Sequence, residues 1–456
     1  MNCAMNSSHL QVCVSRRLHA AGMTAAAFVV VISFVCGMCM FLRMPFMVMG
    51  SGEGEEAEVS SLTLAKRMAA TAIALWNPTG PGKDQFQYEL GVLLRGMELL
   101  WRLTGDPNYF HFLKFKVDRF VNVVGNGSSS SNSVSIRTYN LTQFSLDNIL
   151  TGRILLTLYD TTHEHKYRQA AALLRKQLKE QPRTKEGGFW HKLIYPFQMW
   201  LDGLYMAEPF YAQYAKQLSF LDQQEEEEEQ APHAEDFNDI ALQFKLMFKH
   251  ARDPKTGLLY HGYDESRKQK WSNPITGDSP SFWARGVGWY CIGLVDTLDF
   301  FPSDHPHRAE LLSILHQVTI AVKKVQDPET GLWWEVLDKG GEAGNYLESS
   351  AACMFVYTFA KGARKGYLPP EFCQYAHESY SSIVSHFISP STTTVAGGVD
   401  LNGTVSVAGL GGIPYRNGTY AYYVSQEVVT NDPKGVGAFL MASIEIAKTP
   451  RLCSAD

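Results

Sequence analysis

The sequence has 456 residues, of which 45% are hydrophobic and 19% are charged, a globular composition that excludes a wholly disordered or collagen-like chain. With 41 Lys and Arg against 46 Asp and Glu, the formal net charge is -5, so no overall basic charge favours nucleic acid. The 9 Trp, 21 Tyr and 25 Phe suit either rings that stack on sugars and flat ligands or a large aromatic core.

The first 58 residues differ in composition from the rest of the chain. Residues 20–42 carry no charge over a span long enough to cross the hydrocarbon core of a bilayer. Two arginines precede this span and an acidic stretch follows it, which places the N-terminus in the cytosol by the positive-inside rule. We therefore expect a short tail over 1–19, a transmembrane signal anchor over 20–42 and an acidic linker over 43–58. A cleaved signal peptide is the alternative, and it gives a secreted protein with the same orientation.

Glycosylation signals agree with a lumenal or extracellular location for the body of the chain. Four N-x-[ST] sequons occur, at Asn126, Asn140, Asn402 and Asn417, and glycan acceptors matter only on that side of the membrane. Four of the eight cysteines fall in the tail and the anchor, which leaves too few in the body for a disulfide framework.

Residues 59–450 repeat a helical spacing of apolar side chains. Apolar residues recur at every fourth position from Leu146 to Leu158, and a second helical pattern runs from Tyr167 to Leu178, which indicates a helical hairpin. The same layout returns along the chain. The pattern predicts twelve helices, at 60–75, 87–103, 107–124, 145–161, 164–180, 199–216, 235–252, 282–300, 305–325, 347–364, 369–388 and 433–448.

The predicted helices alternate in character. The even-numbered ones are rich in Gly, Ala and aromatic residues on all sides, which indicates burial, whereas the odd-numbered ones carry charge on one face. Six buried helices surrounded by six amphipathic ones make an (α/α)6 barrel of six helical hairpins. The sequence therefore predicts an all-α fold in one domain over 59–450, with an open helical solenoid as the alternative.

The inner helices of such a barrel run parallel, so their N-terminal ends meet at one mouth. Asp147 and Asp202 begin consecutive inner helices, which predicts two carboxylates close together. A carboxylate pair suits acid–base catalysis because one ionised group raises the pKa of the other and keeps a proton available. Either aspartate could instead be a plain helix cap.

Aromatic and basic side chains occupy the starts of the other inner helices. Arg285 between Trp283 and Trp289 would offer a fork of donors to a sugar carboxylate, or it could form a structural ion pair with Glu348. His191 and His261 fall on loops at the mouth and could bind sugar hydroxyls or cap turns. Metalloprotease, P-loop, nucleophile-elbow and Rossmann motifs are absent from the sequence, and we expect no metal and no nucleotide cofactor.

Several sequence runs resemble glycoside hydrolase family 105, the unsaturated rhamnogalacturonyl hydrolases, and more distantly family 88, the unsaturated glucuronyl hydrolases. The resemblance covers Leu62 to Lys448 in order. It is carried by F-S-L-D-N from Phe144, G-G-F-W-H up to His191, W-L-D-G-L-Y-M from Trp200, W-A-R-G-V-G-W from Trp283 and N-Y-L-E-S-S from Asn345. Val287, where Asn is more usual, and insertions at 127–133 and 223–230 depart from the family pattern.

The resemblance implies an (α/α)6 barrel and an unusual reaction, in which water adds to the C4–C5 double bond of an unsaturated uronic acid at the end of a lyase product. Asp202 would protonate C4 and then take a proton from the water that adds at C5, and Asp147 would bind the ring and tune Asp202. The expected substrate-binding residues are Tyr88, His191, Trp200, His261, Trp283, Arg285 and Trp289.

Other functions remain open at this point. The closest enzyme alternative is a glucuronyl hydrolase that acts on other polysaccharides. A membrane-tethered barrel that binds carbohydrate without turning it over is an alternative of a different class, although both aspartates are intact. A sugar epimerase is a third possibility, and it would favour a pair of histidines at the mouth.

Overall fold

The computed structural model describes residues 59–76, 85–124, 133–218, 232–391 and 395–449. All of these residues belong to one compact unit, Val59–Asp456. The predicted tail, the anchor over 20–42 and the acidic linker therefore lie outside the described residues. Within the described ranges, the structure contains no helix whose length and apolar character would let it span a membrane.

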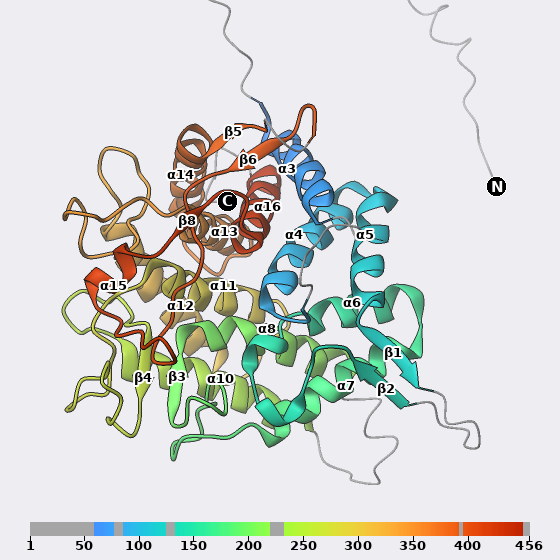
Figure 1. The fold of residues 1–456 in the computed structure, drawn as a ribbon, viewed down its shortest axis with the longest axis horizontal. Coiled ribbons are helices and arrows are strands. Elements are labelled where there is room, and N and C mark those ends of the chain that lie inside the picture. The colour runs from blue at the N-terminus through green and yellow to red at the C-terminus, as the bar shows by residue number, and fades with distance from the viewer. Residues whose placement is uncertain (1–58, 77–84, 125–132, 219–231, 392–394, 450–456) are drawn as a thin grey trace, which may run out of the picture. The chain divides into compact units, whose positions relative to one another are not determined.

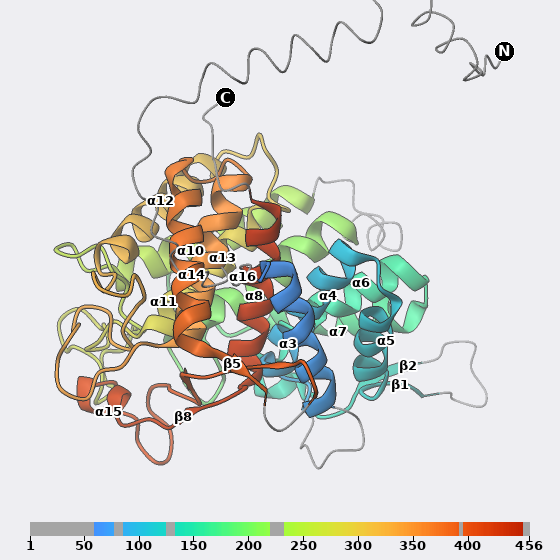
Figure 2. The same cartoon turned by 90° about the horizontal axis from the view of Figure 1, so that it is seen from above.

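Six helices form a closed inner ring. Each packs against the next one along the chain, and the last packs against the first, which lies far away in sequence (Figures 1 and 2). A closed ring excludes the open solenoid. The inner helices are α4 (Tyr88–Thr104), α6 (Gly152–Thr162), α8 (Leu201–Gln217), α11 (Ala284–Thr297), α13 (Ser349–Arg364) and α16 (Pro433–Lys448).

Six further helices surround this ring. Five of them pack against two neighbouring inner helices, and α10 packs against α8 and the outer helix α12. They are α3 (Ser61–Leu75), α5 (Pro107–Asp118), α7 (His165–Glu180), α10 (Pro232–Ala251), α12 (Arg308–Lys324) and α14 (Glu371–Phe387). All twelve predicted helices are thus present, in the predicted inner and outer roles, and the (α/α)6 barrel is confirmed.

Contacts between helix ends establish that the inner helices run parallel. At one end, Arg285 near the start of α11 reaches Ser350 near the start of α13, with 3.4 Å between Nη1 and Oγ. At the other end, Arg364 in the last turn of α13 pairs with Glu445 in the last turns of α16 at 2.6 Å. The N-terminal ends of the inner helices therefore gather at one mouth, where their dipoles place partial positive charge.

Short antiparallel strand pairs lie in the loops between the helices. The pairs are β1 (Val121–Val124) with β2 (Ser133–Ile136), β3 (Gln198–Trp200) with β4 (Gly262–Asp264), β5 (Ile388–Pro390) with β6 (Val399–Leu401), and β7 (Thr404–Val405) with β8 (Val428–Val429). A short helix, α15 (Tyr420–Val424), precedes β8, and two 3-10 turns, η2 (Leu141–Gln143) and η3 (Leu146–Asn148), precede α6.

Two predicted helices are shorter than expected. The helix predicted at 107–124 ends at Asp118 because the valine-rich segment that follows pairs with β2 as strand β1. The helix predicted at 145–161 begins only at Gly152. Before it, the backbone N–H of Leu146 donates to the carbonyl of His191 at 3.1 Å, so this segment joins another loop at the mouth and turns through η3 instead.

Candidate active site

The β3–β4 pair positions Asp202 beside His261. Trp200, the last residue of β3, pairs with Gly262 of β4, and α8 begins at the next residue. The backbone N–H of Leu201 donates to the carbonyl of His261 at 3.0 Å. Asp202 is thereby held in the first turn of α8, and its Oδ2 lies 2.9 Å from His261 Nε2.

A third side chain completes this arrangement from the far end of the sequence. The hydroxyl of Tyr423, on α15, lies 2.7 Å from His261 Nδ1. Tyr423 and His261 are fully buried, and the ring of Trp283 lies 4.6 Å from that of His261. Tyr423, His261 and Asp202 therefore form one continuous chain of hydrogen bonds that ends at the mouth.

The charges along this chain follow from burial. Burial lowers the pKa of His261, which keeps the imidazole neutral. Burial by itself would raise the pKa of Asp202, but the interaction with His261 outweighs that effect, and the pKa lies below its ordinary value. Because an ionised carboxylate only accepts, His261 donates from Nε2 and its Nδ1 accepts from the Tyr423 hydroxyl.

Asp147 is ionised and paired. It lies in η3, where Lys192 Nζ donates a short hydrogen bond to its Oδ2 and His191 Nε2 lies 3.3 Å from its Oδ1. Burial alone would raise the pKa of Asp147, but Lys192 and His191 hold it well below its ordinary value. The charge of Asp147 is largely compensated by Lys192, and its repulsion raises the pKa of Asp202 by less than His261 lowers it, so the pKa of Asp202 stays below its ordinary value.

The three tryptophans support the site from within the barrel. Trp200 is 4% exposed and carries the rings of His191 and Tyr195 stacked at 4.5 and 4.9 Å, so little of it is open to a sugar. Trp283 and Trp289 are buried. Trp283 donates from Nε1 to Glu335 at 2.9 Å, and Trp289 stacks on Tyr205 at 5.3 Å. All three position other groups rather than offering an open ring face.

Arg285 is buried in structural contacts. Its Nη1 donates to the carbonyl of Val405 at 2.5 Å and lies 3.9 Å from Glu348 Oε1, while Glu348 also accepts from the backbone N–H of Ala351 at 2.7 Å. The structural alternative of an Arg285–Glu348 pair is therefore correct. The idea that Arg285 turns a free fork of donors toward a sugar carboxylate is wrong, because the guanidinium is buried and its Nη1 is bound to the backbone.

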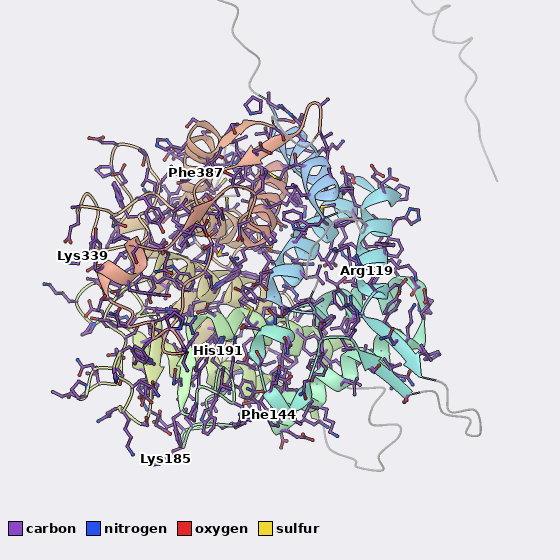
Figure 3. The ribbon with its side chains drawn as sticks, in the orientation of Figure 1. Arg119, Phe144, Lys185, His191, Lys339 and Phe387 are labelled. Atoms are coloured by element: carbon purple, nitrogen blue, oxygen red, sulfur yellow. The ribbon has the colours of Figure 1, made fainter. Side chains whose placement is uncertain are left out.

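The most accessible of the predicted residues are the two carboxylates and Tyr88. The side chains of Asp147 and Asp202 are 13% and 14% exposed, and that of Lys192 is 24% exposed, whereas His261 and His191 are buried. Tyr88, half-buried at the start of α4, presents its edge to Trp289 at 6.3 Å. Figure 3 marks His191 near the middle of the barrel in that view. The reactive surface of the mouth thus consists of Asp202, Asp147 and Lys192.

Sequence reasoning missed four residues of the site, namely Lys192, Tyr195, Arg416 and Tyr423. Arg416 donates from Nη2 to the hydroxyl of Tyr195 at 2.9 Å, and its guanidinium lies 5.7 Å from the ring of Trp200. The sequence contains one weak indication of Arg416 and Tyr423: the Gly-rich loop 409–418 is followed at once by the aromatic residues of α15. Across the described ranges, the structure places no three His, Cys, Asp or Glu side chains together as a metal cluster.

Comparison with known proteins agrees with this geometry. Residues 63–450 match the sequence model of Glycosyl Hydrolase Family 88. A glycoside hydrolase of family 105 from C. acetobutylicum ATCC 824 is 42% identical, with a TM-score of 0.76 over 85% of this chain and 99% of that one. A 24.9 kDa protein of the picA locus of Rhizobium radiobacter is 43% identical over 192 residues, which are 41% of this chain and 82% of that protein.

A more distant structure shares the fold alone. The unsaturated glucuronyl hydrolase of Bacillus sp. GL1, responsible for the degradation of glycosaminoglycan, is 13% identical, with a TM-score of 0.56 over 84% of this chain and 95% of that one. The barrel and its mouth therefore define a glycoside hydrolase of the helical-barrel class. The chain belongs to Glycosyl Hydrolase Family 88, in the group that also includes its family 105 relative.

Proposed function

We propose that the protein removes the 4,5-unsaturated uronic acid from the non-reducing end of oligosaccharides that polysaccharide lyases produce. The preferred substrate is an unsaturated galacturonyl–rhamnose unit from rhamnogalacturonan. Similarity to a family 105 glycoside hydrolase over 85% of the chain supports the substrate class. No cofactor enters the proposal, and the partner is the oligosaccharide itself.

The unequal pairing of the two carboxylates carries this proposal. An ordinary glycosidase needs two carboxyl groups that act together, one to protonate the leaving oxygen and one as a base or nucleophile. Here Asp147 is bound to Lys192 and His191, which leaves Asp202 as the carboxylate able to exchange a proton at the mouth. A single acid–base residue suits hydration of a double bond better than direct displacement at an anomeric carbon.

The proposed reaction uses Asp202 twice. Its carboxyl group delivers a proton to C4 of the unsaturated ring, and the resulting carboxylate takes a proton from the water whose oxygen bonds to C5. The product is a hemiketal at C5. Ring opening turns C5 into a ketone and C1 into a hemiacetal, which expels the remaining sugar with its glycosidic oxygen. Asp202 ends the cycle protonated, as it began.

Substrate binding favours protonation of Asp202, and the proton comes from the solvent. In the protein alone, the lowering of the Asp202 pKa by His261 outweighs the rise that burial causes, so the group is ionised near neutral pH. An anionic sugar at the mouth adds negative charge and excludes water, and both effects raise the pKa of a neighbouring carboxyl. Binding is therefore coupled to proton uptake by Asp202, in place of the uptake that Asp147 was expected to cause.

The direct test follows the ultraviolet absorbance of the conjugated enol ether with two unsaturated disaccharides, one galacturonyl–rhamnose and one glucuronyl. We expect absorbance to fall with the first substrate. Loss with the glucuronyl substrate alone would replace the proposed specificity with that of a glucuronyl hydrolase. A folded protein that consumes neither substrate would contradict the proposed reaction and favour a barrel that only binds carbohydrate.

We also propose that the barrel lies in the lumenal or extracellular space, tethered by residues 20–42 or secreted after their cleavage. The charge pattern around that segment supports this orientation. Asn140 and Asn417 are exposed, whereas the Asn402 amide donates to Ser389 at 3.0 Å and to the Phe387 carbonyl at 3.2 Å.

Peptide-N-glycosidase treatment of protein from eukaryotic cells tests this placement. We expect a loss of mass that Asn140→Gln and Asn417→Gln each reduce and that Asn402→Gln leaves unchanged. Protein whose mass does not change on this treatment would contradict the lumenal placement.

A further inference from the structure

Arg416 differs from the other basic side chains at the mouth in its charge balance. Each of the others has a carboxylate close by: Lys192 contacts Asp147, Lys434 lies 2.9 Å from Asp432, and Arg285 lies 3.9 Å from Glu348. Arg416 has no such partner. Among the described residues, none of its nitrogens lies within ion-pairing distance of an Asp or Glu oxygen. Its positive charge is therefore uncompensated at the mouth.

The guanidinium is nevertheless held firmly. Nε donates to the carbonyl of Gly411 at 2.8 Å, and Nη2 donates to the carbonyl of Leu410 at 3.0 Å and to the hydroxyl of Tyr195 at 2.9 Å. All three acceptors are neutral, so they orient the group without cancelling its charge. Nη1 donates to none of the described residues and is not among the buried atoms that lack a partner. That nitrogen is left to face solvent.

The loop is shaped around this side chain. Backbone hydrogen bonds join Gly411 and Arg416 in both directions, at 2.8 and 3.1 Å, and so close a tight loop. A Cβ at Gly409 would lie 2.3 Å from Nη1, so the backbone can approach the guanidinium only because this residue is glycine. A cation fixed in advance loses little conformational entropy when it binds an anion.

Two aromatic rings, those of Trp200 and His261, connect Arg416 with the reactive Asp202. The guanidinium of Arg416 is 5.7 Å from the ring of Trp200, whose neighbour at 5.5 Å is the ring of His261, the partner of Asp202. Burial lowers the pKa of His261, and the charge of Arg416 lowers it further, which places the two groups in each other's field. Arg416 and Asp202 therefore act on the same region of the mouth.

We propose that Arg416 binds the carboxylate of the unsaturated uronate, the role that the sequence suggested for Arg285. This inference rests on the proposed function. The uronate carboxylate is attached to C5, the carbon that receives water, so its binding group must lie near Asp202. The Nη1 of this fixed guanidinium keeps its N–H donors free of hydrogen bonds to the described residues, and it can donate them to a carboxylate oxygen. Lys192 is less suited because its charge already compensates Asp147.

The test compares the binding of the unsaturated uronate with the binding of its methyl ester, in protein variants that cannot turn over either ligand. Calorimetry measures binding of unsaturated galacturonyl–rhamnose and of its uronate methyl ester to the Asp202→Asn variant, with and without Arg416→Gln. We expect the acid to bind about 10- to 100-fold more tightly than the ester when Arg416 is present. Arg416→Gln should remove that difference, and Arg416→Lys should restore part of it. Lys270→Gln, which removes an exposed charge from a neighbouring loop, is the matched control and should keep the difference.

The outcomes separate this inference from the proposed function. An acid–ester difference that persists in the Arg416→Gln protein would overturn the role of Arg416, whatever the turnover assays give. A difference that depends on Arg416 in a protein whose Asp202-intact form consumes no substrate would support the carboxylate site and overturn the proposed reaction. Protein that is folded by circular dichroism and binds neither ligand would overturn both.

Discussion

The side chains of the mouth divide into groups that react and groups that hold them. Asp202 is the only one of the two predicted acids with a neutral partner, since His261 loses its charge through burial while Asp147 is bound to Lys192. Trp200 and Arg285, which the sequence placed in contact with the sugar, are enclosed by protein. The chemistry of the site is therefore concentrated in one carboxylate.

Asp202→Asn should abolish turnover without unfolding the barrel. The substitution keeps the shape and a hydrogen bond to His261 but removes the exchangeable proton, and we expect kcat to fall by about 10²- to 10⁴-fold. Initial rates and the melting temperature check this outcome. Asp160→Asn, an exposed change on α6, is the control and should match the parent protein in both measurements. Retained turnover in Asp202→Asn would remove its catalytic assignment.

Tyr423→Phe should change the pH dependence of the reaction. The Tyr423 hydroxyl donates to Nδ1 and so favours the neutral imidazole whose Nε2 donates to Asp202. Loss of that donor favours proton uptake by the Asp202–His261 pair, so the basic limb of the kcat profile should move to higher pH, and the looser His261 should lower kcat about tenfold.

The neighbouring tyrosine provides a matched comparison for that experiment. Tyr422 loses the same hydroxyl in Tyr422→Phe, but its hydroxyl accepts from the backbone N–H of Gly409 at 3.0 Å and makes no hydrogen bond to His261. Its profile should keep the parent shape. Equal shifts in the two variants would mean that the effect comes from α15 as a whole and not from the hydrogen bond to His261.

The helices α4 and α16 close the ring, and two glycines set how near they come. A Cβ at Gly437 would lie 2.5 Å from the backbone oxygen of Val92, and a Cβ at Gly96 would lie 2.8 Å from the Cβ of Leu440. Contacts this short cannot be relieved by rotating a side chain when one partner is backbone. The first and last inner helices, α4 and α16, thus pack so closely that no methyl group fits between them at these two glycines.

Gly437→Ala should destabilise the barrel even though alanine favours helices. We expect a loss of about 1–3 kcal/mol in the free energy of unfolding, because the added methyl group forces α16 away from α4. Denaturant titration measures the change. Gln374→Ala on the exposed face of α14 introduces an alanine without a collision and should change stability by less than about 0.5 kcal/mol. A Gly437→Ala protein as stable as its parent would contradict close packing at the seam.

Sequence patterns predicted the elements far better than the loops between them. Helical periodicity depends on neighbours three and four residues away, so all twelve helices could be found from the sequence, with Asp202 at the start of α8 and Asp147 in the turn η3 just before α6. Arg416 and Tyr423 could not, because they reach Tyr195 and His261 across 221 and 162 positions of the chain. The sequence also could not decide whether Arg285 faces a ligand or Glu348, since both residues lie at helix starts.

At the scale of the whole barrel, one buried carboxylate ties several inner helices together at the end away from the mouth. Asp296 on α11 accepts from Arg153 of α6 at 2.5 Å and from Lys361 of α13 at 2.5 Å, and Arg95 of α4 lies 3.9 Å away. All three cations are buried.

Asp296→Asn should therefore lower the stability of the whole barrel, by about 3–5 kcal/mol, because it leaves buried cations uncompensated. Burial alone would raise the pKa of Asp296, but Lys361, Arg153 and Arg95 outweigh it and the pKa is lowered. A lowered folded-state pKa contributes stability above the ordinary carboxyl pKa and loses it as the pH falls through the folded value.

The melting temperature of the parent protein should accordingly decline as the pH is lowered. The difference in melting temperature between the parent and Asp296→Asn should become smaller over the same pH range. Asp160→Asn should follow the parent at every pH. An Asp296→Asn protein with the same melting temperature as its parent at neutral pH would show that this carboxylate does not hold the helices together.

The most direct test of the account is the position of solvent hydrogen in the product. Unsaturated galacturonyl–rhamnose is turned over in D₂O, and nuclear magnetic resonance follows C4 of the released uronic acid. Protonation of the double bond by Asp202 predicts one deuterium at C4 in a single orientation in every product molecule. Direct hydrolysis would release the unsaturated sugar, which rearranges in solution. C4 lies beside the C5 ketone of the product and exchanges with solvent afterwards, so its deuterium is measured at the earliest time points. Deuterium in both orientations equally at those points, or none at C4, would contradict hydration by Asp202.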